Sequence, residues 1–307
     1  MKQEIQVVTS FFNIKRADWG TFRRSEQLYL EYFKVWAKIK NNLVVYVQTE
    51  EMKKDIEAFR AGLGLHEKTK VIIIKEFETL DQELYSSIKR ATENPVQQGA
   101  RLLPKNPEVW SADYNYVMLL KMWCVRDAIQ KGYASGMVAW VDFGYDHGGA
   151  VLDKNSDFNF KWEYDFPDKI NLFLIQELDD RPIFDIVCSM DTYVMGTVII
   201  GADHLWDDFW QLMRQSMISL NDCGLTDDDQ NIILMSYRKR PDIFATHLSD
   251  WQMQMKQFGG EHLRVVSVQE SSCKKLARKI YRKLRYTKDN YKLSRRIFKY
   301  LSEKELH

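Results

Sequence analysis

The sequence predicts an α/β fold in which a mostly parallel central sheet is flanked by helices, with a basic helical tail at residues 271–307. Short, nearly continuous apolar segments alternate with amphipathic segments in the first half of the chain, which is the order of strand–helix–strand units. Strands of a parallel sheet are buried on both faces, so their sequences are apolar almost without interruption. We expect residues 1–270 to form one α/β domain.

The first half of the chain predicts alternating strands and helices. Within 21–40, apolar and aromatic residues recur every three or four positions, the period of an amphipathic helix. The predicted elements are a strand at 5–12, a helix at 21–40, a strand at 43–47, a helix at 52–63 and a strand at 71–74. Ligands of such folds bind beyond the carboxyl ends of the strands, so the residues after each strand are candidates for a site.

The second half of the chain is expected to complete the α/β domain and to end in the helical tail. A segment with prolines and polar residues at 94–107 predicts a flexible loop. The other predicted elements are helices at 81–90, 113–130, 205–220, 227–238 and 272–301, and strands at 137–141, 171–176, 183–188 and 194–201.

The composition is that of a globular protein with a sizeable core. Hydrophobic residues make up 45% of the 307 residues and charged residues 28%, while Gly and Pro are sparse. No apolar segment reaches the length of a membrane span, and the N-terminus lacks the features of a signal peptide, so we expect a cytoplasmic protein. The cysteines show no C-x-x-C spacing, which predicts neither a zinc site nor a disulfide framework.

An apolar strand at 137–141 runs directly into Asp142, which places a carboxylate at the mouth of the sheet. Nucleotide-sugar transferases use a carboxylate pair there to hold a divalent cation, which bridges the diphosphate of the donor. The usual pattern is Asp-x-Asp, but Gly144 stands at the third position. Asp146 and His147 are the candidates for a second ligand. The alternative interpretation is a polar turn that ends a strand.

Three consecutive acids and an amide, Asp227 to Gln230, precede an apolar helix. Helix capping and the helix dipole account for one or two acids at such a position. The additional acid indicates a second role, such as binding acceptor hydroxyls beside the reacting carbon.

His247 follows the acidic segment by seventeen positions from Gln230. It is a candidate metal ligand if the chain returns to the cation late in the fold. A hydrogen-bonded structural histidine is the alternative.

The tail is strongly basic. From residue 274 to the end of the chain there are thirteen Lys and Arg against three acidic residues, so this segment carries about +10 and the remainder about −9 of a net charge of +1. Apolar positions recur every four residues among the basic ones, which is typical of a helix that lies on an anionic membrane surface. We expect residues 274–299 to form this contact. A solvated helix packed on the domain is the alternative, and no nucleic-acid partner is expected.

Four segments in this order resemble the HtrL/YibB family of bacterial proteins, which is linked to lipopolysaccharide and surface-glycan biosynthesis and regarded as a candidate group of glycosyltransferases. They are VVTSFFNIKR, YFKVWAKIKNNLVVYVQTE, AWVDFGYDHGG and MGTVIIGADHLWDDFW, the last followed by DDDQNIILM. The matching segments run from about residue 5 to residue 251. The resemblance implies a GT-A fold, a nucleotide-diphosphate sugar as donor, with a UDP-sugar favoured, and Mn²⁺ or Mg²⁺ as cofactor.

The resemblance also implies roles for individual residues. Asp142 takes the place of a metal-binding acid, with Asp146 and His247 as further ligands. Asp229 and Gln230 look like the Asp-Gln pair of retaining transferases, so retention is favoured. In an inverting enzyme, Asp228 or Asp229 would be the general base.

The residues expected at the nucleotide are those that follow the first strand. Thr9, Phe11 and Arg16 would border the nucleotide. Lys121 would reach a phosphate, with a solvent-facing lysine as the alternative.

These inferences predict the transfer of a hexose from a nucleotide sugar to a lipid-linked or lipopolysaccharide acceptor at the cytoplasmic face of the inner membrane. The alternative function is a non-catalytic glycan- or membrane-binding protein that retains the fold.

Overall fold

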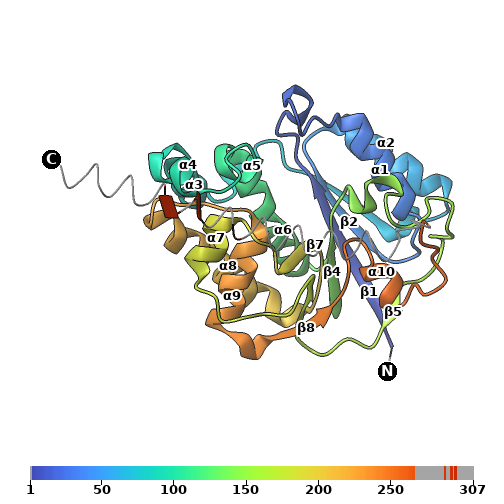
Figure 1. Ribbon diagram of the computed structural model, residues 1–307. Coiled ribbons are helices and arrows are strands. Elements are labelled where there is room, and N and C mark those ends of the chain that lie inside the picture. The colour runs from blue at the N-terminus through green and yellow to red at the C-terminus, as the bar shows by residue number, and fades with distance from the viewer. Residues whose placement is uncertain (1, 267–286, 288–290, 293, 296–307) are drawn as a thin grey trace, which may run out of the picture.

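The computed structural model describes residues 2–266, 287, 291, 292, 294 and 295. A single mixed sheet runs through the middle of this part of the chain, with helices on both sides (Figure 1). The strands are β1 Gln3–Phe11, β2 Leu43–Val47, β3 Thr69–Ile73, β4 Met137–Val141, β5 Glu163–Tyr164, β6 Ile170–Leu174, β7 Val194–Ala202 and β8 Phe244–Leu248. The helices are α1 Glu26–Trp36, α2 Glu50–Gly62, α3 Gln82–Glu93, α4 Pro95–Ala100, α5 Pro107–Trp110, α6 Ala112–Gln130, α7 Ile183–Ser189, α8 Trp206–Asp222, α9 Asp229–Lys239 and α10 Gln254–Gln257.

The strand order is β3-β2-β1-β4-β7-β6-β8, and β5 pairs with the start of β1. Strands β3, β2, β1 and β4 are parallel to one another, as the alternation of strands and helices predicts, while the short β5 is antiparallel to β1. β7 is antiparallel to both β4 and β6, and β8 is parallel to β6. The α/β class is therefore confirmed, while the sheet is mixed rather than mostly parallel.

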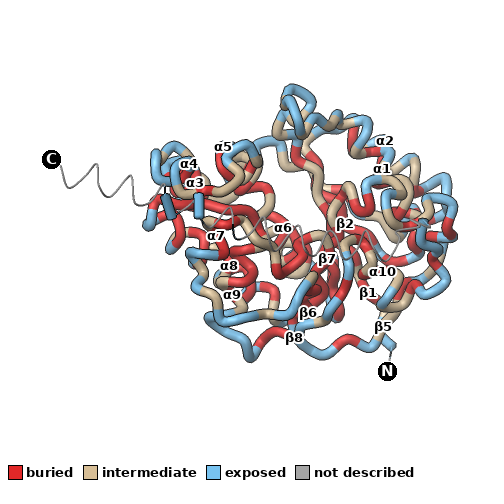
Figure 2. Tube along the Cα trace, in the orientation of Figure 1, coloured by how far each residue is buried: buried red, intermediate tan, exposed pale blue. Residues whose placement is uncertain are grey.

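Two hydrophobic cores fill the space between the sheet and its helices. One face of the sheet packs against α3, α6, α8 and α9, and the other against α1 and α2 together with segments near residues 152–166 and 255–263. The inner strands β2, β4, β6 and β7 are buried almost throughout (Figure 2). Burial on both faces explains why β2 and β4 read as five apolar residues in succession.

Several helices begin where the sequence offers a side chain that can accept a hydrogen bond from the first turn. Such N-caps satisfy backbone N–H groups that have no partner within the helix. The capping residues are Ser25 for α1, Thr49 for α2, Asp81 for α3, Asn94 for α4, Ser111 for α6 and Asp228 for α9.

Two predictions of local structure were wrong. Residues 183–188 form helix α7, not a strand, because Ile186 and Val187 face the core from one side of a single short helix. Residues 94–107 are not a flexible loop but contain α4 and lead into α5, each with a proline in its first turn, where proline fits a helix.

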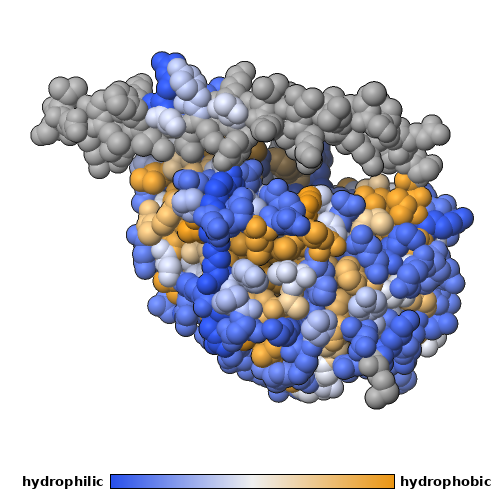
Figure 3. Space-filling model, turned by 60° about the horizontal axis from the view of Figure 1, so that its bottom comes forward, coloured by the Kyte–Doolittle hydropathy of each residue, from blue (hydrophilic) through white to orange (hydrophobic). Residues whose placement is uncertain are grey.

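The surface and the tail bear on the predicted membrane contact. The face shown in Figure 3 is largely hydrophilic, with hydrophobic side chains gathered in separate patches. Among the described residues, no helix is long and apolar enough to cross a membrane. The helix predicted at 272–301 falls almost entirely on residues that the structure does not describe.

Candidate active site

The candidate site lies at the edge of the sheet where β1 and β4 end and β7 begins. Asp142 follows β4 directly, and its backbone N–H donates to the carbonyl oxygen of Thr197 on β7 at 2.8 Å. The indole Nε1 of Trp140 donates to Asp142 Oδ1 at 2.8 Å. The Asp142 side chain stays partly accessible, at 28% exposed. The end of β4 therefore presents a fixed, accessible carboxylate, as the sequence predicts.

Lys121 lies at the centre of the site and joins its two halves. Its Nζ is 2.9 Å from Asp142 Oδ1 and 2.8 Å from Asp229 Oδ2, and it donates to the Gly196 carbonyl oxygen at 3.1 Å. Its side chain is only 4% exposed. Burial lowers the pKa of Lys121, but the two carboxylates outweigh this effect and raise it overall. The expected solvent-facing or phosphate-binding lysine is a buried ion-pair partner.

Asp229 fits against the sheet only because residue 196 is glycine. A Cβ atom at Gly196 would lie 1.8 Å from Asp229 Oδ2, a distance that no pair of such atoms can adopt. The pKa of Asp229 is raised by burial and by Asp142, although Lys121 opposes this effect. The small-residue start of β7 thus creates the space for a buried acid.

Replacement of Gly196 by Ala is expected to push Asp229 away from Lys121 and to lower the free energy of unfolding by about 1–3 kcal/mol. Urea denaturation measures this loss. Gly99→Ala is the matched control, since no atom lies within 4 Å of a Cβ at that position in α4. Equal stability of the two variants would contradict the close approach of Asp229 to β7.

Asp228 is buried yet keeps one carboxylate oxygen for other contacts. It is 8% exposed, and its Oδ1 accepts from the backbone N–H of Gln230 at 3.1 Å as the N-cap of α9. Within the described part of the chain, Oδ2 has no hydrogen-bond partner. Burial raises the pKa of Asp228 well above its ordinary value, and Asp227, Asp229 and Glu108 raise it further. A carboxyl group with a raised pKa and a free oxygen is suited to proton transfer.

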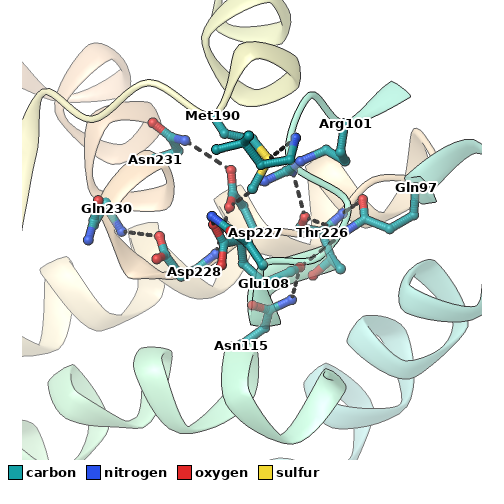
Figure 4. A network of polar contacts seen from close by, with 12 residues as sticks. Gln97, Arg101, Glu108, Asn115, Met190, Thr226, Asp227, Asp228, Gln230 and Asn231 are labelled. Carbon is teal, nitrogen blue, oxygen red and sulfur yellow. Dashed lines mark hydrogen bonds and ion pairs between the residues drawn. The ribbon is translucent and has the colours of Figure 1, made fainter. Parts of the chain in front are cut away.

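Asp227 has a different role from its two neighbours, because both of its oxygens are held by protein groups (Figure 4). Oδ1 pairs with Arg101 Nη2 at 2.8 Å and also accepts from the Asp228 N–H at 3.0 Å. Oδ2 accepts from Asn231 Nδ2 at 2.9 Å. Arg101 is completely buried. Asp227 is therefore a structural acid that fixes the chain just before the candidate base.

The segment 94–107 provides the groups that hold the acidic turn. Gln97 donates through Nε2 to the Thr226 carbonyl oxygen at 2.9 Å and accepts from the Thr226 N–H at 3.1 Å. Arg101 Nη1 donates to the same carbonyl oxygen at 2.9 Å. Nε2 of Gln97 also donates to the Glu108 carbonyl oxygen, so α5 joins the network (Figure 4). This explains why the segment is ordered as short helices.

Gln230 is oriented by Thr192, two residues before β7. Its Oε1 accepts from the Thr192 hydroxyl at 2.7 Å. Because the amide oxygen is occupied, the Nε2 group of Gln230 is the part available as a hydrogen-bond donor. The structure thus joins Asp142 and Asp229 through Lys121, and Asp228 and Gln230 flank Asp229 at the start of α9.

Aromatic and cationic side chains surround Arg16 on the segment after β1. The Arg16 guanidinium lies 5.0 Å from the ring centre of Trp19, 5.8 Å from Tyr29 and 5.9 Å from Tyr114, and it donates to the Tyr29 hydroxyl at 2.6 Å. Burial raises the pKa of Tyr114, and the charges of Asp228 and Asp229 raise it further while Arg16 lowers it. The Tyr114 hydroxyl therefore feels both the acids at the start of α9 and the charge of Arg16.

A second cation lies on the same side. Arg24 Nη1 is 3.1 Å from His147 Nε2. Desolvation lowers the pKa of His147, and the positive charges of Arg24 and Arg16 add to this effect while Asp142 opposes it. Both arginines also contact one ring, since Arg16 donates to the Tyr29 hydroxyl and the Arg24 guanidinium lies 5.9 Å from the Tyr29 ring centre. Phe11, also predicted at the nucleotide, packs against Tyr29 with ring centres 5.2 Å apart.

Thr9 differs from its prediction. It is completely buried in β1, so in this structure its side chain is not accessible to a nucleotide.

Asp146 is turned away from Asp142 and stabilises its own loop. Oδ1 accepts from the Val151 N–H at 2.7 Å and Oδ2 from the Leu152 N–H at 2.9 Å, and the residue is 1% exposed. Its backbone is left-handed, with φ at 56°. The carboxylate predicted as a metal ligand is thus committed to closing the loop at 146–152.

Burial raises the pKa of Asp146 from 3.8 to about 6, although its two backbone hydrogen bonds lower it. The folded protein therefore binds this proton more tightly than the unfolded chain does. The resulting contribution to the free energy of unfolding is complete below pH ~4 and is lost as the pH rises through ~6. Asp146→Asn removes the titration. The stability of the wild type relative to this variant should fall by about 1–2 kcal/mol between pH 4 and pH 7. A difference that does not change with pH would contradict this burial.

His247 lies in β8, which β7 and β6 separate from β4 in the sheet. Its Nε2 is 2.9 Å from Asn171 Oδ1, and its ring packs against Phe166, Phe173 and Phe258. Burial lowers its pKa. His247 is therefore a hydrogen-bonded structural histidine, which was the alternative to a metal ligand.

The acids at this edge do not fit the divalent cation that the resemblance implies. Asp142, Asp146 and His247 do not come together, and the described residues contain no group of three or more His, Cys, Asp and Glu side chains that could hold a metal ion. A Cβ at Gly144 would contact the Tyr29 ring at 3.0 Å, so the third position of the Asp-x-Asp pattern packs against α1. The facing oxygens of Asp142 and Asp229 are bound to Lys121 instead.

Sequence reasoning missed Arg101, Gln97, Thr192 and Gly196, and it did not place Lys121 in the core. The available signal was weak: an arginine and a glutamine in a proline-containing segment, and a glycine at the start of an apolar strand.

Two comparisons relate this chain to known proteins. A family model described as "Bacterial protein of unknown function (HtrL_YibB)" matches residues 3–260, which include every side chain of the candidate site. Protein HtrL of Escherichia coli (strain K12) is 32% identical over 262 residues, covering 80% of this chain and 87% of that protein.

Proposed function

The chain belongs to the HtrL_YibB family of bacterial proteins, and we propose that it is a glycosyltransferase that moves a hexose from a nucleotide-diphosphate sugar to a glycan acceptor. The observation that supports this most is the pairing of Asp142 and Asp229 through Lys121 where β4 ends and β7 begins, with Asp228 and Gln230 directly beside Asp229 in the chain. Ligands of α/β sheets bind at such edges. The cationic and aromatic side chains around Arg16 offer a place for the nucleotide diphosphate.

In the proposed reaction, Asp228 accepts the proton of an acceptor hydroxyl. The freed oxygen attacks the anomeric carbon, the bond between that carbon and the diphosphate oxygen breaks, and the nucleoside diphosphate leaves with the electron pair. Asp228 is preferred to Asp229 as the base because its Oδ2 is free, whereas Asp229 Oδ2 is held by Lys121. Such a single displacement inverts the anomeric configuration, in contrast to the retention suggested by the Asp-Gln resemblance. The anomeric configuration of the product distinguishes inversion from retention.

We place the acceptor in the lipid-linked or lipopolysaccharide class, with the enzyme at the cytoplasmic face of the inner membrane. The argument is the charge of residues 274–299, which would be attracted to anionic lipid. Removal of this segment should then reduce transfer to a lipid-linked acceptor more than binding of the donor.

A thermal-shift screen of nucleoside diphosphates and nucleotide sugars tests the proposal, because a ligand that binds only the folded state raises the unfolding temperature. We expect one nucleotide class, with uridine diphosphate compounds favoured, to stabilise the wild type. No shift with any nucleotide, at concentrations up to the millimolar range of typical KM values, would contradict a donor site.

A further inference from the structure

The ammonium of Lys121 is fully engaged inside the site. An ammonium has three N–H donors, and the three close oxygens around Nζ belong to Asp142, Asp229 and Gly196, at 2.8 to 3.1 Å. No donor is left for a substrate phosphate. Lys121 therefore acts on the site through the two carboxylates.

Lys121 also occupies the position between the two acids that a divalent cation would need. Such an ion binds carboxylate oxygens, but Asp142 Oδ1 and Asp229 Oδ2 already face the ammonium. An ion that displaced Lys121 would leave a buried ammonium without its partners, which is strongly unfavourable. A Cβ at Gly144 would already lie 3.0 Å from the Tyr29 ring, so the second acid of an Asp-x-Asp pair would crowd this ring.

We propose that Lys121 is a built-in replacement for the divalent cation, and that Arg16 and Arg24 bind the donor diphosphate without metal. This inference rests on the proposed function. Arg16 donates to the Tyr29 hydroxyl, and the Arg24 guanidinium lies 5.9 Å from the centre of the same ring. The Tyr29 ring packs against Gly144, two residues after Asp142, so both arginines lie near the end of β4. A guanidinium offers paired N–H donors that match phosphate oxygens, so two arginines at this edge can neutralise a diphosphate.

Binding of the nucleotide sugar found in the screen is measured by calorimetry on the full-length wild type, in EDTA and in millimolar Mn²⁺ or Mg²⁺. We expect dissociation constants that agree within about twofold under all three conditions, because no metal takes part in binding. A metal requirement would appear as a change of tenfold or more, which corresponds to at least about 1.4 kcal/mol. Binding that requires the metal would overturn the inference and leave the proposed function standing. The absence of binding under every condition would overturn both.

Variants of the arginines and of Lys121 test their proposed roles separately. Arg16→Gln and Arg24→Gln should each weaken donor binding at least tenfold in EDTA. Arg126→Gln changes a partly exposed arginine that pairs with Asp207 on α8, and it should leave donor binding unchanged. Unchanged binding in both site variants would overturn the role of the arginines.

Lys121→Met removes the internal cation and leaves Asp142 and Asp229 facing each other. We expect Mn²⁺ alone to raise the unfolding temperature of this variant and not that of the wild type. The proposal would be overturned if Mn²⁺ alone stabilised the wild type and this stabilisation disappeared in Asp142→Asn. This comparison does not require Lys121→Met to fold.

Discussion

Asp228→Asn is expected to lower kcat about 10²- to 10⁴-fold while leaving donor affinity nearly unchanged, because it removes the proposed general base. Asparagine is as good an N-cap as aspartate, so the start of α9 and the fold are preserved. Nucleoside diphosphate release in the presence of acceptor measures the effect. The matched control is Asp222→Asn, which changes an exposed acid at the end of α8.

The same residue predicts how activity depends on pH. Burial and the neighbouring acids raise the pKa of Asp228 well above its ordinary value, and a general base works in its deprotonated form. Activity should therefore fall as the pH decreases through a value well above 4, and this limb should be absent from the residual activity of Asp228→Asn. Equal kcat values for Asp228→Asn and Asp222→Asn would contradict the assignment of the base.

Arg101→Met is expected to lower the free energy of unfolding by about 3–5 kcal/mol, because it leaves Asp227 buried without its cation. Arg126→Met provides the comparison, since its ion pair with Asp207 is partly exposed and should contribute at most about 1 kcal/mol. Urea denaturation of both variants measures the difference.

A double variant tests the reason for the loss. Arg101→Met combined with Asp227→Asn removes both buried charges, so it should be more stable than Arg101→Met alone, in a non-additive manner. A cost for Arg101→Met no larger than that for Arg126→Met would contradict the structural role of the buried pair.

The local pattern of apolar and polar residues predicts where individual strands and helices begin and end. The end of β4 at Asp142 follows from five apolar residues in succession, and the start of α9 follows from acids ahead of an apolar helix. Asp142 and Asp229, at these two positions, both pair with Lys121. The antiparallel β7 was recognised as a strand, but its direction depends on how the chain crosses the sheet, which hydrophobic patterning does not encode.

The sequence did not reveal pairings between distant residues. Lys121 reads as a surface lysine on a helix, because its partner Asp229 lies 108 positions away. Arg101 is separated from Asp227 by 126 positions, so a proline-containing segment looked flexible. Asp146 lies four positions after Asp142 but binds the amides of its own loop, since its left-handed backbone turns the side chain inward.

The most direct test is to follow labelled hexose from the nucleotide sugar into a lipid-linked or lipopolysaccharide acceptor fraction, with wild-type protein, Asp228→Asn and Asp222→Asn. The transferase proposal predicts label in the acceptor with the wild type and Asp222→Asn, and a loss of at least a hundredfold with Asp228→Asn. If the donor binds to the wild type but no label reaches any acceptor fraction, the chain is a binding protein that retains the fold, and the transferase proposal is wrong.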